Sequence, residues 1–240
     1  MFILNPVSFR GHAAIEDFIA KTRGVLQASG DESGHLHLSR FPRDAIGVIR
    51  AQAARHADKI LRVYSVGGDG TLFDCLNGVV GLDNAELVVA PGAEVRDLPA
   101  LIKAVTAPAD VIRCNGNYAL SSFAVGAEAA AIARGRRVNA ATKRRMQDLS
   151  YRLASSVTRL DKHLRSQRYN ITVDGDTING THADLKAILG TLRHKQLHLT
   201  SDEPILVSLD GEIFYESKLT VQIVPDAVNL AALKENDNEK

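Results

Sequence analysis

The chain has 240 residues, of which 45% are hydrophobic, and its formal net charge is +1 at pH 7. This length and apolar fraction suffice to bury a core in one large domain or two small ones, and they exclude a disordered chain. The balanced charge excludes a surface built as a whole for nucleic acid.

The first half of the chain predicts alternating strands and helices. Short apolar runs indicate strands, and apolar residues spaced three or four apart indicate amphipathic helices. The expected strands are Phe2–Leu4, His35–Leu38, Leu61–Val66 and Leu87–Ala90, and the expected helices are Ala14–Leu26, Asp44–His56, one opening at Leu72–Leu76, and Leu98–Val105. Strands separated by helices of this length lie parallel in a sheet covered on both faces, so we expect an α/β fold.

The second half of the chain predicts an antiparallel, β-rich domain. Its β-like segments are Tyr118–Ala124, Tyr169–Val173, Leu185–Leu189, Gln196–Leu199, Ile205–Leu209 and Leu219–Val224. Turn signals at Asp174-Gly175, Asn179-Gly180 and Asp210-Gly211 separate several of them. We expect the boundary between the two domains near Arg113.

A glycine-rich turn, Gly67-Gly68-Asp69-Gly70-Thr71, joins the third strand to the third helix. Its glycines allow close backbone approach, and the helix directs its N–H groups and positive dipole end to the same place, which suits a phosphate chain. The spacing matches neither the Walker loop nor the dinucleotide fingerprint. The alternative is a tight strand-to-helix turn with a capping aspartate. Asn5, Arg40 and Gly67 all follow strand ends, where ligands gather in parallel sheets, and this convergence favours phosphate binding.

A basic stretch runs from Arg134 to Arg168, with apolar residues at helical spacing. It predicts a basic amphipathic helix whose charged face is solvated, and a surface for anionic lipid headgroups is the second interpretation. No aromatic residues are interleaved for base stacking, so nucleic acid is not expected as a partner.

The location in the cell is predicted from the cysteines and the chain start. Cys75 and Cys114 lie far apart without metal-ligand spacing, which is typical of reduced thiols in a cytosolic protein. The start has no signal-peptide pattern, and no apolar run is long enough to span a bilayer. We expect a cytoplasmic protein whose membrane contact, if it has one, is peripheral.

Four segments together resemble the diacylglycerol kinase catalytic family, which includes bacterial lipid kinases and sphingosine kinases. They are Asn5-Pro6-Val7-Ser8, Gly67–Thr71 followed by Asn77-Gly78, Phe123–Ala129, and Leu209-Asp210-Gly211-Glu212. The glycine segment alone also occurs in NAD kinases and, with Ser in place of Thr, in phosphofructokinases. The first and last segments favour lipid kinases.

The resemblance implies an α/β nucleotide domain at 1–113, to which 219–233 returns, and a substrate domain at 114–218. It implies transfer of the ATP γ-phosphoryl group to a lipid hydroxyl, such as that of diacylglycerol, with Mg²⁺. Asp210 would be the general base, supported by Glu212. Asp69 would orient the turn or hold a metal-bound water. Together with the strand ends, the resemblance gives as nucleotide-site residues Asn5, Ser8, Arg40, Gly67, Gly68, Asp69, Gly70, Thr71 and Asp97.

The chain departs from the family pattern after the fourth strand. Where the family has Pro-x-Gly-Thr-x-Asn-Asp-Phe, Ala93, Glu94 and Arg96 replace the Gly, Thr and Asn. Glu94 would repel phosphate unless Arg96 or a metal neutralises it. The second domain is also shorter than usual.

Three interpretations of the function follow from the matches and the departures. An active lipid kinase is the first. The second is a non-catalytic relative that binds nucleotide, lipid or a partner protein, and the third is a kinase of NAD or another soluble acceptor. The sequence does not identify the acceptor lipid or decide whether the protein forms a homodimer.

Overall fold

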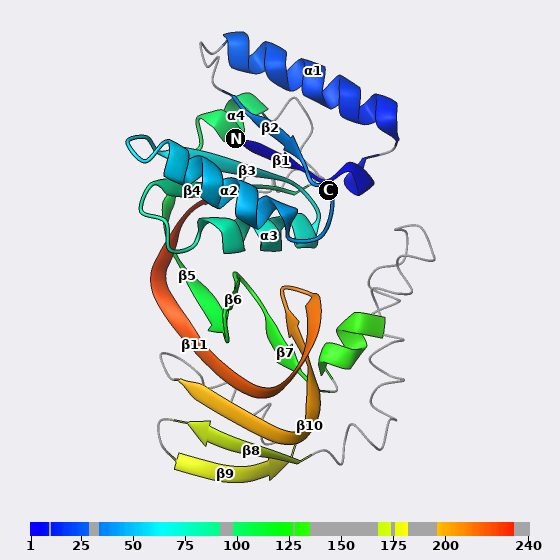
Figure 1. The fold of residues 1–240 in the computed structure, drawn as a ribbon, viewed down its shortest axis with the longest axis vertical. Coiled ribbons are helices and arrows are strands. Elements are labelled where there is room, and N and C mark those ends of the chain that lie inside the picture. The colour runs from blue at the N-terminus through cyan, green and yellow to red at the C-terminus, as the bar shows by residue number, and fades with distance from the viewer. Residues whose placement is uncertain are drawn as a thin grey trace, which may run out of the picture. The chain divides into compact units, whose positions relative to one another are not determined.

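A computed structural model describes residues 1–9, 11–28, 34–91, 98–126, 128–134, 168–173, 176–181 and 196–232. The chain forms two compact units, one made of Met1–Asp110 and Pro225–Lys240 and the other of Val111–Val224. Strand β11 contributes residues to both units (Figure 1).

The first unit is built on a parallel sheet, as the sequence predicts. Its strands are β1 (Phe2–Leu4), β2 (Leu36–Leu38), β3 (Leu61–Gly67), β4 (Ala85–Pro91) and the end of β11 (Glu212–Ala232). The strand order is β2-β1-β3-β4-β11. Asn229–Ala232 of β11 pair in parallel with Glu86–Val89 of β4, so the returning segment completes this sheet.

Helices α1 (His12–Ala28), α2 (Asp44–Arg55), α3 (Asp69–Val79) and α4 (Leu98–Ile102) pack on the sheet. Successive strand residues point to opposite faces. On one face Phe2 and Tyr64 form a core cluster with Phe18 of α1 and Leu101 of α4. Helices α2 and α3 lie against each other (Figure 1). A side chain at Gly78 of α3 would come within 2.8 Å of Ile49 Cδ1 of α2.

Helix α4 is shorter than predicted. It ends at Ile102, whereas the periodicity extends it to Val105. The guanidinium of Arg62 donates to the carbonyl oxygens of Ile102 at 2.9 Å and Ala104 at 3.2 Å. These bonds satisfy carbonyls at the helix end and let the chain leave towards β5 (Ala107–Cys114).

The second unit is antiparallel, as predicted. It contains β6 (Asn117–Ala119), β7 (Phe123–Val125), β8 (Arg168–Val173), β9 (Asp176–Thr181), β10 (Leu197–Leu209), the end of β5 and the first part of β11. Strand β10 pairs antiparallel with β11, β7 and β8. The Asp210-Gly211 turn is confirmed, because Leu209 pairs with Glu212 and both turn residues have positive φ, 46° and 81°.

Three sequence expectations in this unit are wrong. The strand predicted for 118–124 is broken into β6 and β7, because the N–H groups of 120–122 bind the Asp210 carboxylate instead of a neighbouring strand. The strands predicted at 196–199 and 205–209 are one strand, with a register shift between Thr200 and Ile205. Asn179 and Gly180 form no turn, because they pair with β8 inside β9.

Several predictions lie outside the described residues: the strand Leu185–Leu189, the basic helix between Arg134 and Arg168, and the segment Gly92–Asp97. Among the helices that the structure describes, none combines the length and apolar character needed to cross a membrane. Both cysteines are free and buried, and burial raises the pKa of Cys75 and of Cys114 to about 12. Both thiols are therefore protonated near neutral pH.

Candidate functional site

The glycine-rich turn connects β3 directly to α3. Gly68 precedes the helix in an extended conformation, with φ −91° and ψ −169°, and α3 begins at Asp69. The helix therefore starts earlier than predicted, and Thr71 lies in its first turn. The N–H groups of Thr71 and Leu72 both donate to the Gly68 carbonyl, at 3.0 and 3.1 Å. The positive end of the helix dipole thus lies at the carboxyl edge of the parallel sheet.

The first two glycines of the turn differ in their surroundings. A Cβ on Gly67 would lie 2.3 Å from Thr71 Oγ1 and 2.8 Å from Thr71 Cβ, so contact with the helix start accounts for this glycine. A Cβ on Gly68 would meet nothing within 4 Å. The tight-turn interpretation therefore explains Gly67, whereas the open space at Gly68 is available to a ligand.

Thr71 carries a buried hydroxyl without a hydrogen bond. The residue is 4% exposed, and Oγ1 has no partner among the described residues. Leaving a buried polar group unpaired costs about 1–3 kcal/mol, so native proteins rarely do so without a reason. A ligand atom at the helix start would supply the missing partner.

Asn5 and Ser8 follow the end of β1. The Asn5 N–H donates to the carbonyl of Val66 at 3.4 Å, which ties the end of β1 to the residue before Gly67. Asn5 Oδ1 accepts from the Val7 N–H at 3.0 Å and caps a short 3₁₀ helix, η1 (Pro6–Ser8). Its Nδ2 donor has no partner among the described residues, and Ser8 is partly exposed at the end of η1.

Arg40 follows β2 and is anchored by Asp44, the first residue of α2. Asp44 Oδ2 accepts from the Arg40 N–H at 3.0 Å and lies 2.9 Å from His37 Nε2. The Arg40 guanidinium lies 3.6 Å from Asp44 Oδ1 and is 72% exposed. The hydrogen bond from the Arg40 N–H, with those from His37 and the Arg40 side chain, holds the pKa of Asp44 below its usual value of 3.8, against the opposing effect of burial.

Sequence reasoning placed Asp44 at a helix start and missed this role. The signal was present, because an acidic residue opening a helix soon after His37 and Arg40 has two hydrogen-bonding residues close before it in the chain, one in β2 and one in the connecting loop. Its side chain is 4% exposed, which marks it as an organising group of this loop.

The Asp210 carboxylate receives five hydrogen bonds from one turn. Oδ2 accepts from the Leu120 N–H at 2.6 Å. Oδ1 accepts from the N–H and hydroxyl of Ser121, at 3.0 and 2.8 Å, and from those of Ser122, at 2.8 and 3.4 Å. The carboxylate therefore shapes the turn at 120–122. Only Oδ2 retains a lone pair for a further donor, since a carboxylate oxygen accepts about two hydrogen bonds in its plane.

The structure gathers part of the predicted site. Asn5, Ser8, Arg40 and the turn 67–71 all lie in the first unit, at or past the ends of β1, β2 and β3. Asp210 and Glu212 belong to the second unit, and Asp97 lies outside the described residues. Within the described part of the chain, no three His, Cys, Asp or Glu residues are grouped to hold a metal ion.

Comparison with known proteins identifies the fold. No family model matches the chain, and no curated protein matches its sequence. Three solved structures from Bacillus anthracis str. Sterne share the fold. Two are described as a "putative diacylglycerol kinase", with 18% identity, coverage of 96–97% of this chain and 96% of theirs, and TM-scores of 0.65 and 0.68. The third, a diacylglycerol kinase, is 17% identical, covers 96% and 95%, and has a TM-score of 0.62. The chain thus has the fold of these proteins along nearly its whole length.

Proposed function

We propose that this protein is an ATP-dependent lipid kinase that transfers the γ-phosphoryl group to a lipid hydroxyl such as that of diacylglycerol. The observation that carries the proposal is the turn 67–71, which opens α3 at the carboxyl edge of a parallel sheet. The same fold in proteins described as diacylglycerol kinases supports the choice of reaction.

The groups at the sheet edge suit a triphosphate. The N–H group of Gly70, in the first turn of α3, and the open space at Gly68 would receive phosphate oxygens. The Thr71 hydroxyl would gain its missing partner there. Asn5 Nδ2 and the exposed Arg40 guanidinium provide further donors past the neighbouring strands. These groups fit a triphosphate because they are hydrogen-bond donors and the triphosphate is an anion.

Mg²⁺ fits this donor set only as a companion of the phosphates. Such an ion keeps several waters and binds through one or two carboxylates together with substrate phosphates. Asp69, in the first turn of α3, is the carboxylate placed to hold it or its water. When bound, Mg²⁺ neutralises the charge on the transferring group.

The acceptor side of the reaction is assigned to Asp210. In this proposal Oδ2, which has a single donor among the described residues, takes the proton of the lipid hydroxyl as it attacks phosphorus. Oδ1 keeps its four hydrogen bonds and fixes the carboxylate orientation. Glu212, the first residue of β11, would support Asp210 in this role.

Thr71→Val tests the nucleotide site. Valine keeps the shape but removes the unpaired hydroxyl, so the stability of the free protein should be unchanged or rise by about 1 kcal/mol. In the wild type, ATP with Mg²⁺ at about 100 times its Kd should stabilise the fold by about 2.7 kcal/mol, seen as a rise in Tm. The valine variant should lose most of that rise.

The matched control is Thr22→Val, because Thr22 is equally buried but donates to the Phe18 carbonyl at 2.7 Å in α1. That variant should lose stability and keep the full ATP response. No rise in Tm with millimolar ATP in the wild type would refute a nucleotide site. Transfer of labelled phosphate to a panel of lipids, with NAD included, identifies the acceptor.

A non-catalytic relative that binds nucleotide is the second candidate. The five hydrogen bonds of Asp210 favour it, because they give this carboxylate a structural task that needs no reaction. The sequence change to Glu94 also favours the second candidate, because a carboxylate there would repel phosphate. An ATP-dependent rise in Tm without phosphate transfer to any acceptor would select this candidate over the kinase.

A further inference from the structure

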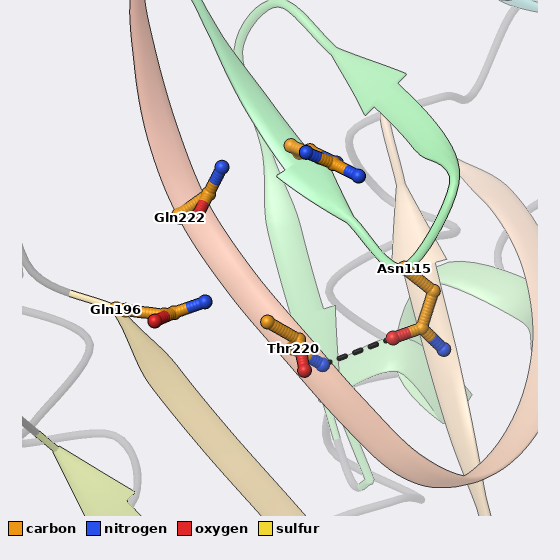
Figure 2. A pocket seen from close by; sticks show the side chains of 5 residues that line it. Asn115, Gln196, Thr220 and Gln222 are labelled. Carbon is orange, nitrogen blue, oxygen red and sulfur yellow. Dashed lines mark hydrogen bonds between the residues drawn. The ribbon is translucent and has the colours of Figure 1, made fainter. Parts of the chain in front are cut away.

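We infer that the second unit contains a separate binding site for a phosphate ester, in a polar hollow bordered by β5, β10 and β11. The hollow has a volume of about 390 Å³ and is lined by Arg113, Asn115, Gln196, Thr220 and Gln222 (Figure 2). All five lie in Val111–Val224, so this site is distinct from the turn 67–71 and does not depend on the proposed kinase activity.

The polar lining follows from strand alternation. Leu219 and Val221 of β11 are buried at 2% and 6% exposure, and Thr220 and Gln222 point to the opposite face. Gln196 lies just before β10, where Leu197 and Leu199 are fully buried. A polar face of this kind is usually flat and solvated, but here it is concave.

One wall of the hollow is fixed by Asn115. Its Oδ1 accepts from the Thr220 N–H at 2.9 Å, and its Nδ2 donates to the Lys218 carbonyl at 3.0 Å. Its own N–H donates to the Thr220 carbonyl at 3.0 Å. These bonds hold the turn after β5 against β11, and Figure 2 shows the first of them. This wall of the hollow is therefore preformed, because the side chain and the N–H of Asn115 are hydrogen-bonded to the backbone of β11.

Each of the remaining lining residues can donate a hydrogen bond from its side chain. The Arg113 guanidinium has no hydrogen bond or ion pair with the described residues, and none of those residues that line the hollow carries a carboxylate. Figure 2 shows the Gln196 and Gln222 side chains extending from their backbones into this space. The Thr220 hydroxyl lies 3.0 Å from His198 Nδ1, which orients it.

These groups select an anion that takes several donors at once. A guanidinium binds two phosphate oxygens through parallel N–H bonds, and amides and a hydroxyl can bind the others. The volume exceeds that of a lone phosphate and falls within the range of small-ligand sites. The ligand class is therefore a phosphate with a small polar substituent. The headgroup of an anionic phospholipid and a soluble phosphate ester share this chemistry.

The test is equilibrium binding to the full chain without ATP. The soluble probe is glycerol 3-phosphate, followed by calorimetry, and the lipid probes are vesicles of phosphatidylglycerol and of phosphatidylcholine, followed by co-sedimentation. Arg113→Gln should weaken binding at least about tenfold, because it removes a charged, bidentate donor. Arg113→Lys should retain part of the affinity. Arg113 is exposed, so these variants should fold normally, and their Tm verifies this.

The control is Arg23→Gln, which removes an exposed arginine from α1 in the other unit and should leave binding unchanged. Binding of glycerol 3-phosphate supports a soluble ligand, and binding of phosphatidylglycerol vesicles alone supports a lipid headgroup. The inference is overturned if no probe binds or if Arg113→Gln binds as the wild type does. It is also overturned if Arg113→Gln and Arg23→Gln lose affinity equally. A kinase assay does not enter this test, so failure of either proposal is seen separately.

Discussion

Gly67→Ala probes the contact on which the turn between β3 and α3 is built. The new Cβ would lie 2.3 Å from Thr71 Oγ1 and 2.8 Å from Thr71 Cβ, both closer than real Cβ contacts. Rotation about χ1 can move the Thr71 oxygen, but Cβ is fixed to the helix backbone. Thr71 is 4% exposed, so the first turn of α3 has little space into which it can move.

The expected cost is about 1–3 kcal/mol, the usual range for inserting a methyl group into a packed site. For a chain of this size, each kcal/mol lowers Tm by about 2–4 °C. Urea denaturation and thermal melting of the two proteins measure the difference. Gly67→Ala combined with Thr71→Ala should recover part of the lost stability, because the second substitution removes the threonine oxygen. The recovery should be partial, because alanine at position 71 still has a Cβ atom in the same place.

Gly24→Ala provides the control for a glycine without such contacts. Gly24 lies within α1, and a Cβ there would meet nothing within 4 Å. Alanine should stabilise this helix by about 0.5–1 kcal/mol, because it reduces the entropy lost on folding. If Gly67→Ala were as stable as the wild type, the turn would have room for a side chain, and the contact with Thr71 would not explain the glycine.

Two further substitutions test the organising carboxylates. Asp44→Asn should cost about 1–3 kcal/mol near neutral pH. The pKa of Asp44 is lowered in the fold, so its ionised form stabilises the protein above pH 3.8 and this stabilisation is lost as the pH falls through the lowered value. Urea denaturation should therefore show the deficit shrinking below pH 3.8, and a constant deficit would contradict a role for the charge. Asp210→Asn turns an amide donor towards a cluster of N–H and hydroxyl donors and should cost about 2–3 kcal/mol, whereas unchanged stability would contradict its role in the turn at 120–122.

The parallel half of the fold was predictable because its signals are local. Strand β3 is a largely apolar segment that ends in glycines, and the observed Leu61–Gly67 extends the predicted strand by one residue. A strand buried on both faces is apolar along most of its length, so composition alone locates it. The start of α3 was predicted too late, because Gly68 directly before the helix and Gly70 in its first turn hide the helical pattern.

The antiparallel half depends on pairs that are distant in the chain. The break at 120–122 is caused by Asp210, ninety residues away, and no window of sequence contains both. Strand β9 was missed because Asn179-Gly180 is typical of a turn, yet β8 pairs with it through that dipeptide. The anchoring of Arg40 by Asp44 was local, and it was missed because the acidic residue was interpreted only as a helix start.

The sequence allows two interpretations of Asp210, a residue of a hairpin turn and a general base. The contacts of its carboxylate make these two interpretations compatible. The turn at 120–122 uses mainly Oδ1, which accepts four of the five hydrogen bonds. Loss of turnover in Asp210→Asn would therefore not identify a base, because the same change disturbs the turn. Ser121→Ala separates the two roles, since it removes one hydrogen bond from Oδ1 and leaves Oδ2 unchanged. If Oδ2 is the base, this variant should lose about 1 kcal/mol of stability and keep its turnover.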